Sequence, residues 1–333
     1  MRTNEEEEWT NYVIESKDST FYHQIGWKNV VKNTYGHKPI YLIARDKDHI
    51  VGILPMFLIR NPFLKSSLVS LPFSQYGGIC ADNPQIGLNL FDAMIEMQKK
   101  HRIRYAEIRS LNCLPVTGVP DKSYYSLVLP LQPDIEIQWK KLRKTMRQLV
   151  AKAKSQKIEV AFNSNNPEIF YDVYTHSMHN FGAPAHSENF FKNIFREFPK
   201  NTRVAEANFH QECIGTIFLL EFKGTIISGW GASDKQFTHL YHNYLLYWEV
   251  IQDACKCNLS AFDFGRSMKD EGTYIFKTGW GAEPSQIYYQ YFPEQKLDTK
   301  KINLNRRIFA EIWKHIPLVV SKHLGPIIRR NIP

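Results

Sequence analysis

Hydrophobic and polar positions along the chain follow the same order of patterns twice. In each copy, β-branched and aromatic runs separated by turn residues predict a meander of strands. A long stretch with apolar residues at helical spacing follows, at 85–101 in the first copy and at 236–257 in the second. Each copy closes with another strand-like run, at 105–110 and at 261–267. This order predicts an α+β fold with mixed sheets.

The duplication also predicts two domains in tandem. Pro130 and Pro133 mark the boundary, because prolines punctuate the end of a regular element. We therefore expect a first domain at 1–132, a second domain at 133–300 and a C-terminal helical segment at 301–333. A basic helical stretch is expected to open the second domain, at 135–156.

Length and composition narrow the class of protein. A chain of 333 residues with 43% hydrophobic content can bury a core in each of two domains. Its apolar runs fall short of the roughly 20 residues that span a bilayer, and the acidic start at 5–8 does not resemble a secretion signal. The five scattered cysteines lack the usual zinc spacings. We expect reduced thiols, no metal site and a cytoplasmic protein.

The net charge of +9 favours a polyanionic partner, such as RNA, an anionic membrane surface or a phosphate-bearing substrate. Basic residues concentrate at 140–157, where no acidic residue lies between Glu136 and Glu159. Arg143 and Arg147 are one helical turn apart, so we expect them to grip one anion together. An ordinary solvated helix remains the alternative.

Polar and aromatic side chains gather at 262–281, a stretch that begins strand-like and is then punctuated by glycines. Because a loop after a buried strand is where a rigid sheet usually presents its chemistry, we interpret this segment as a site on a loop. Its candidate residues are Asp263, Arg266, Tyr274, Lys277 and Trp280. Asp263 alternates with Phe262 and Phe264, so we expect its carboxylate to point away from the apolar face and to orient Arg266.

Several short motifs resemble, in order, the Fem-type aminoacyltransferases of the GNAT acyltransferase superfamily. They are Trp27 with Gly36-His37, the runs at 71–78, 177–180 and 262–267, and the Phe-Lys-Thr-Gly-Trp-Gly element at 276–281. The chain looks closest to the FemAB-related proteins encoded with exosortase and exopolysaccharide systems. The resemblance covers most of the chain and implies tandem GNAT-like domains.

The resemblance also implies a chemistry, the transfer of an amino acid from aminoacyl-tRNA to an amine of a peptidoglycan precursor. The donor ester is already activated, so the amine attacks it without a protein nucleophile. The family's lysine in this element is credited with stabilising the developing oxyanion, which implies that role for Lys277. A surface lysine after a strand is the alternative. The predicted catalytic residues are Lys277 and Asp263, and the predicted substrate-binding residues are Arg143, Arg147, Arg266, Tyr274, Trp280, Tyr76, Ser74 and His179.

Two departures from the family leave parts of this chemistry open. The first domain's last strand offers Glu107 and Arg109 where the family often has an acidic residue near the acceptor, so no general base is assigned. No heptad run between Pro133 and Phe162 is long enough for the coiled-coil arm of some Fem proteins. Aminoacyl-tRNA, acyl carrier protein and acyl-CoA therefore all remain as donors. The glycine turn that cradles coenzyme A in ordinary GNAT domains is missing from the sequence, and no cofactor is expected.

We thus expect an acyl- or aminoacyltransferase whose acceptor is an anionic or lipid-linked saccharide of the cell envelope, related to peptidoglycan or exopolysaccharide. A non-catalytic adaptor that binds anionic molecules in an export system is the competing class. The C-terminal segment mixes apolar and basic residues in helices interrupted near Pro317 and Pro326. That pattern fits packing on the second domain or peripheral contact with the inner face of the membrane.

Overall fold

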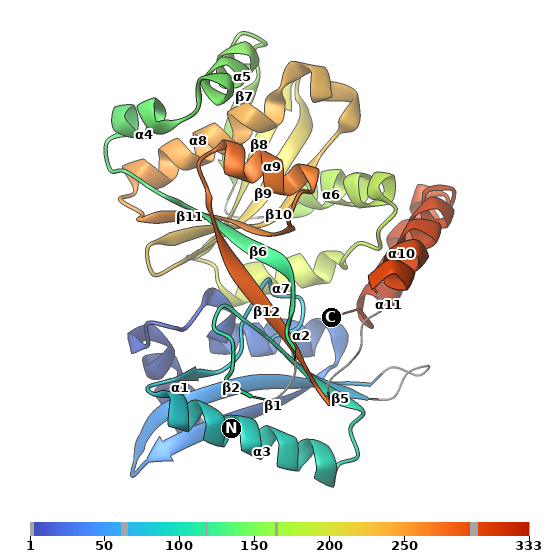
Figure 1. Ribbon diagram of the computed structural model, residues 1–333. Helices are drawn as coiled ribbons and strands as arrows, with labels where there is room; N and C mark the ends of the chain where they lie inside the picture. The colour runs from blue at the N-terminus through green and yellow to red at the C-terminus, as the bar shows by residue number, and fades with distance from the viewer. Residues whose placement is uncertain (1–2, 61–65, 117–118, 164–165, 294–298, 333) are drawn as a thin grey trace. The chain divides into compact units, whose positions relative to one another are not determined.

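The chain divides into two compact units, and two of its passages from one unit to the other lie within a strand. The computed structural model describes residues 3–60, 66–116, 119–163, 166–293 and 299–332. Unit 1 consists of residues 1–124, 286–297 and 330–333, and unit 2 of residues 125–285 and 298–329. Strand β6 (Asp121–Pro130) changes units after Tyr124, and strand β12 (Glu283–Phe292) changes units after Ser285 (Figure 1). The predicted division at residues 132 and 300 follows the linear chain, whereas these units exchange a strand segment.

Unit 1 is built on a mixed sheet with the strand order β1-β2-β3-β5-β12, to which β4 adds by pairing with β2. Its elements are α1 (Thr3–Glu15), a 3-10 turn (Phe21–His23), α2 (Ile25–Tyr35), β1 (Lys38–Asp46), β2 (His49–Ile59), β3 (Ser67–Ser70), β4 (Cys80–Ala81), α3 (Pro84–Lys100) and β5 (Tyr105–Ser110). The amide of Ile86 donates to the Asn83 side chain at 3.0 Å, which caps α3. Leu90 and Met94 of this predicted helix are buried in the core of the unit.

Strand β5 carries a buried ion pair. The Arg109 Nε donates to the Glu107 carboxylate at 2.6 Å, and both side chains are at least nine-tenths buried. The Arg109 guanidinium also lies 5.1 Å from the ring centre of Tyr289 on the neighbouring β12. The carboxylate that the sequence offered near the acceptor is therefore held by an arginine in the core of unit 1.

Unit 2 has the strand order β6-β11-β10-β9-β8-β7. Its elements after β6 are α4 (Ile135–Lys141), α5 (Lys144–Lys154), β7 (Glu159–Asn163), α6 (Glu168–Phe181), α7 (Glu188–Glu197), β8 (Thr202–Phe209), β9 (Glu212–Phe222), β10 (Thr225–Ser233), a 3-10 helix (Lys235–Leu240), α8 (His242–Lys256), β11 (Ala261–Met268), α9 (Gly272–Gly279), α10 (Thr299–Lys314) and α11 (Leu318–Arg329). Strands β7 to β10 pair antiparallel, and β10 pairs parallel with β11.

Alternate residues of β9 face two different cores. Ile217 and Leu219 belong to the core that α8 completes with Leu245 and Val250. Phe218, between them, packs instead against the rings of α6 and α7, with a centroid distance of 5.2 Å to Phe191. Because side chains alternate across a strand, this pattern places helices on both faces of the sheet, as Figure 1 shows.

Two of the predicted helices are broken. The stretch at 135–156 divides into α4 and α5, because Leu142 adopts an extended conformation and is buried in the core. The stretch at 236–257 divides at Tyr241, whose φ of 58° is left-handed and cannot continue a helix. At the C-terminus the chain breaks at Pro317, as predicted, but α11 continues through Pro326.

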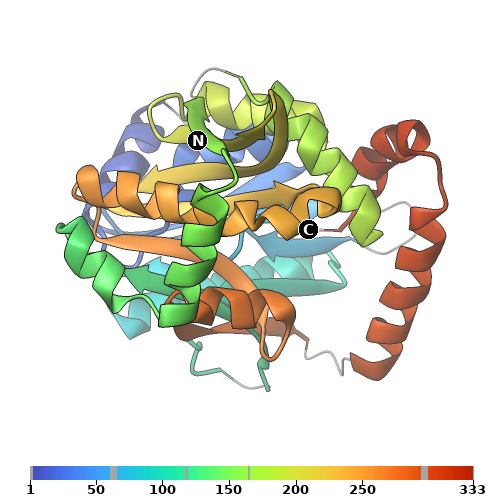
Figure 2. The ribbon, with the colours of Figure 1, turned by 90° about the horizontal axis from the view of Figure 1, so that it is seen from above.

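Helices α10 and α11 pack on α6 (Figure 2). Gly182, which ends α6 with a left-handed φ of 72°, makes the closest contact. A Cβ added there would lie 2.4 Å from the carbonyl oxygen of Ala310 on α10. Only glycine therefore fits between the end of α6 and the backbone of α10.

We expect Gly182→Ala to lower the free energy of unfolding by ~2–4 kcal/mol, because left-handed strain adds to overpacking against a backbone atom. Thermal unfolding would measure the loss, and limited proteolysis at 299–314 would show whether α10 detaches. Gly272→Ala is the matched control, since a Cβ at Gly272 meets nothing within 4 Å. Equal stability of the two variants would contradict the assigned contact.

Candidate active site

Strands β10 and β11 pair over a short length and then part. Their parallel register joins Thr225 to Ala261, Ile226 to Phe262 and Ile227 to Asp263. Both strands continue for several residues beyond this point, and β10 carries an irregularity between Ser228 and Trp230. The ring of Tyr247 on α8 stacks on Phe264 at a centroid distance of 5.4 Å, and its hydroxyl lies 3.4 Å from the Ser228 Oγ. Tyr247 thus contacts both strands where they separate.

Asp263 stands at the last paired position of β11 and is buried. Its Oδ1 accepts a hydrogen bond from the amide of Gly265 at 2.7 Å and one from the Ser126 Oγ at 3.3 Å. Gly265 has a φ of 76°, which favours glycine. The Asp263 carboxylate therefore holds a bend in β11, and its predicted role as the orienter of Arg266 stays a prediction.

The predicted loop after this strand is wrong, because Lys277 lies on the helix α9. Gly272, Gly279 and β-branched residues disfavour a helix there, but Tyr274 and Phe276 pack against the core and stabilise it. The Lys277 Nζ donates to the carbonyl oxygens of Gly265 at 3.1 Å and Arg266 at 3.0 Å. The helix thus places the Lys277 side chain against the bend of β11.

Burial lowers the pKa of Lys277 from its ordinary value of 10.5 to about 8, a shift that the Arg266 charge increases and the Asp263 charge opposes. An ammonium group has three donors, and two are used by the carbonyls. The third donor has no partner among the residues that the structure describes. Lys277 is consequently a desolvated cation with one free donor, rather than a solvated surface lysine.

Helix α5 lies beside the C-terminal end of α9, since a Cβ on Gly279 would be 3.3 Å from the Met146 sulfur. Arg143 precedes α5 and is exposed, and Arg147 is half-buried one turn later, with its amide donating to the Arg143 carbonyl at 3.2 Å. The spacing of residues in the sequence did not predict this contact between α5, with its two arginines, and α9, with Lys277.

Three buried polar atoms on these elements lack a hydrogen-bond partner within the described part of the chain. They are the Nε of Arg147, the Oγ of Ser267 and the Nε1 of Trp280. Buried polar atoms are nearly always hydrogen-bonded, so such atoms mark places for a ligand or a water molecule. Ser267 was not among the predicted site residues, although it closes the motif at 262–267.

The aromatic candidates differ in exposure. Tyr274 is half-buried and meets Tyr125 edge-on at a centroid distance of 5.9 Å. Trp280 is 1% exposed and packs in the core beside Phe264 and Phe276. Trp280 therefore stabilises the end of α9 through its ring contacts.

The remaining candidates belong to other segments of the chain. Ser74 is buried in unit 1 and donates to the Leu71 carbonyl at 2.5 Å, and Tyr76 is half-buried in the same segment. His179, in unit 2, has its Nε2 2.7 Å from the carbonyl oxygen of Ile316. These contacts are structural, and a substrate role for the three residues stays a prediction.

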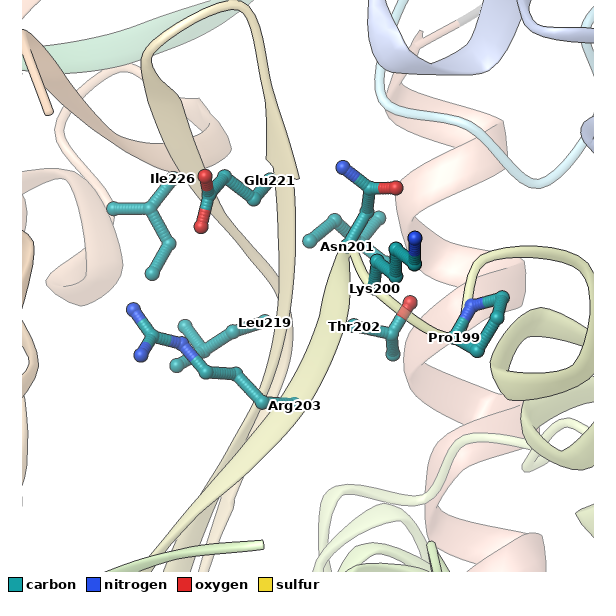
Figure 3. A pocket seen from close by; sticks show the side chains of 9 residues that line it. Pro199, Lys200, Asn201, Thr202, Arg203, Leu219, Glu221 and Ile226 are labelled. Carbon is teal, nitrogen blue, oxygen red and sulfur yellow. The ribbon is translucent and has the colours of Figure 1, made fainter. Parts of the chain in front are cut away.

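A cavity of about 220 Å³ opens elsewhere in unit 2, around the start of β8 and the turn from β9 to β10 (Figure 3). Lys200, Arg203 and Glu221 are among its lining residues, and none of the predicted site residues is. Arg203 is already paired with Asp253 at 2.6 Å. The cavity and the Lys277 group share no residue.

The described residues contain no group of three or more His, Cys, Asp or Glu side chains able to hold a metal ion. No helix in the described ranges is both long and apolar enough to cross a bilayer.

One stretch of sequence holds helix α5, the parallel strands β10 and β11, helix α8 between these strands, and Lys277 after them. The family model described as "Acetyltransferase (GNAT) domain" covers residues 140–278. This stretch matches a GNAT domain. The GNAT stretch includes Arg143, Arg147, Asp263 and Lys277. No curated protein matches the chain at a significant level.

Solved structures share the fold at low sequence identity. FemX is 12% identical with a TM-score of 0.67, and the match covers 90% of this chain and 98% of that one. L-PGS from Bacillus licheniformis is 8% identical with a TM-score of 0.57, covering 93% and 97%. A tandem GNAT protein from the clavulanic acid biosynthesis pathway is 10% identical with a TM-score of 0.53, covering 87% and 94%.

These likenesses confirm the predicted fold class, a mixed α+β fold of tandem GNAT-like domains. The longest helix described is α3, with 17 residues, so the described ranges hold no long coiled-coil arm. The fold is GNAT-like.

Proposed function

We propose that the protein transfers an acyl or aminoacyl group from an activated ester to an amine or hydroxyl of a cell-envelope precursor. The observation that carries the proposal is the Lys277 ammonium group, which is desolvated, fixed by two carbonyl oxygens and left with one free donor. Such a preorganised cation stabilises negative charge more strongly than a fully solvated lysine, because water screens it less.

The reaction needs no protein nucleophile. The acceptor nitrogen or oxygen forms a bond to the donor carbonyl carbon, and the carbonyl oxygen takes up the electron pair as an oxyanion. Lys277 donates its third hydrogen bond to that oxyanion. The intermediate collapses, the bond from carbon to the donor oxygen or sulfur breaks, and the leaving group takes the proton that the acceptor loses. Glu107 is paired with Arg109, so we assign it no role as a general base. The proton passes directly between the two substrates.

The donor carries phosphates in each of the three forms considered: aminoacyl-tRNA, acyl carrier protein with its phosphate-linked arm, and acyl-CoA. The basic side chains of α4 and α5 suit such a donor. Those exposed on these helices and their ends are Lys140, Lys141, Arg143, Lys144, Lys152, Lys154 and Lys157. Arg143 and Arg147 are our candidates for the phosphate contact, because α5 lies beside α9.

The acceptor class rests on the structural neighbours. One is named FemX. Another is a domain of a putative lysylphosphatidylglycerol synthetase from Agrobacterium fabrum, and this name denotes a product in which lysine is attached to an anionic lipid. We propose by analogy a saccharide-bearing, lipid-linked precursor of peptidoglycan or exopolysaccharide.

Purified protein offered each donor separately would test the proposal. Transfer of label from charged tRNA alone would assign an aminoacyltransferase, and transfer from thioesters alone would assign an N- or O-acyltransferase. Failure with all three donors, in the presence of a mixture of amine and hydroxyl acceptors, would argue against the enzyme.

Replacing both arginines, Arg143→Ala with Arg147→Ala, should raise the KM for the donor by ~10- to 100-fold, since a charge-assisted hydrogen bond contributes ~1.5–3 kcal/mol. The matched control is Lys141→Ala with Lys157→Ala, which removes the same charge from exposed positions. Steady-state kinetics at two salt concentrations would measure both. An equal rise in KM for the control would show that only the general positive field acts.

A non-catalytic adaptor remains the second candidate, favoured by the same exposed basic helices. That function predicts that Lys277→Ala preserves the cellular phenotype, while reversal of the charges at 140–157 abolishes it. The enzyme predicts that Lys277→Ala alone abolishes it.

A further inference from the structure

Helix α11 buries small residues and exposes large apolar ones, whereas a helix that only covers its own domain buries the large ones. It buries the small residues Ser321 and Gly325, and a Cβ on Gly325 would lie 3.0 Å from the Ala185 amide nitrogen. Its large apolar residues face solvent instead, with Val319 69% and Ile327 63% exposed. An ordinary amphipathic helix does the reverse.

Helix α10 exposes a matching stripe. Leu304, Ile308 and Ile312 are four residues apart, so they follow one face of the helix, and all three are exposed. The opposite side anchors the helix through Trp313, which is 3% exposed, and through Ala310 against Gly182. Both helices therefore pack on α6 (Figure 2), and each exposes large apolar side chains elsewhere on its surface. Exposed apolar stripes of this kind mark an interaction surface.

The charge around these helices selects the kind of partner. Where side chains of the two helices are described, four are basic and one is acidic: Arg307, Lys314, Lys322 and Arg329, against Glu311. Lys314 pairs with Glu311 at 2.6 Å, and Lys322 pairs with Asp172 of α6 at 3.1 Å. Two copies of so positive a face repel one another, which disfavours a second copy as the occupant. Apolar residues among basic ones are the pattern of a helix that lies in the headgroup region of an anionic bilayer.

We propose that the exposed face of α10 and α11, called here the C-terminal face, binds the surface of an anionic lipid bilayer. The helices lie along the surface and insert their apolar side chains among the headgroups, while the basic side chains meet the lipid phosphates. Binding of this kind would bring the protein to a lipid-linked acceptor, but it does not depend on the proposed transfer reaction.

Flotation of the full-length protein with vesicles tests the proposal without any donor or acceptor. We expect binding to vesicles of phosphatidylcholine mixed with phosphatidylglycerol, weaker binding to phosphatidylcholine alone, and release as salt is raised. The variant Val319→Ser with Ile327→Ser should bind ~30-fold more weakly. The matched control Ile14→Ser with Ile137→Ser removes two exposed apolar side chains elsewhere and should bind normally.

A charge variant, Arg307→Gln with Lys314→Gln, should lose the preference for phosphatidylglycerol. Equal, salt-insensitive binding to both vesicles would overturn the proposal, and so would no binding to either. Light scattering that shows a dimer, dissolved by Val319→Ser with Ile327→Ser, would overturn it in favour of a second copy. Loss of transfer activity with vesicle binding intact would leave this inference standing while the proposed function fails.

Discussion

Lys277→Ala is expected to lower the rate of acyl transfer by ~100- to 1,000-fold, the cost typical of removing one oxyanion donor. The reason is geometric, since the ammonium group is held at 3.0–3.1 Å by two carbonyl oxygens of β11 and keeps one donor for the substrate. Single-turnover kinetics would separate this loss from weaker binding. Lys269→Ala, an exposed lysine just before α9, should keep full activity.

The pH profile distinguishes the two ways in which a lysine can act. The pKa of Lys277 is lowered to about 8, chiefly by burial, so the ammonium form disappears as the pH rises through 8. If the cation stabilises an oxyanion, the rate should fall on the alkaline side, and Lys277→Arg should shift that fall to higher pH. A rate that instead rises through pH 8 only when Lys277 is present would make the neutral amine a base.

The same shift affects stability. Because the pKa in the folded protein lies below the unfolded value of 10.5, the unfolded chain binds more protons between pH 8 and 10.5. Stability should therefore increase with pH across that window, and the penalty of burying the charge is fully present below it. Lys277→Met should accordingly unfold at a higher temperature than the parent at pH 7, by a margin that shrinks above pH 8.

Arg109→Ala should cost ~3–5 kcal/mol of stability, because it leaves the Glu107 carboxylate buried without its counter-charge. The two side chains are 5% and 7% exposed, and the Nε to Oε1 distance is 2.6 Å. Chemical denaturation of the full chain, followed by a probe in unit 1, would measure the loss.

The matched control replaces both partners, Glu107→Gln with Arg109→Met, and should recover most of that stability. Removing both charges at once abolishes the desolvation penalty together with the attraction. Equal destabilisation by the single and the double variant would show that Arg109 stabilises through packing against Tyr289 rather than through its charge.

The repeating order of strands and helices was readable from the sequence because local periodicity decides it. Helix α3 shows this well, since its apolar spacing, its Asn83 cap and its basic last turn all agree. Helix α9 was missed because its two glycines disfavour a helix, and only the core that Tyr274 and Phe276 touch stabilises it. The strand exchange between the units was also invisible, because β12 pairs with β5 across a long separation, Tyr288 with Ser110.

The candidate site was readable only in part. The motif at 262–281 identified Asp263, Arg266 and Lys277 as candidates. In the structure, the Lys277 ammonium group donates a hydrogen bond to the carbonyl oxygen of Gly265 at the bend of β11. The contact between α5 and α9 depends on Met146, a residue with no chemical signature of its own. The buried hydroxyl of Ser267 was missed because a serine in a strand pattern does not reveal whether it has a partner.

The discontinuity of unit 1 has a consequence for synthesis. Residues 286–292 complete its sheet beside β5, yet residues 125–285 leave the ribosome first. At ~5–20 residues per second, the nascent first unit waits ~8–30 s for its last strand. During that interval the peptide groups of Ala106–Ser110 form an open sheet edge, which invites pairing with another chain. Translation speed across the middle of the message should therefore influence how much of the protein aggregates.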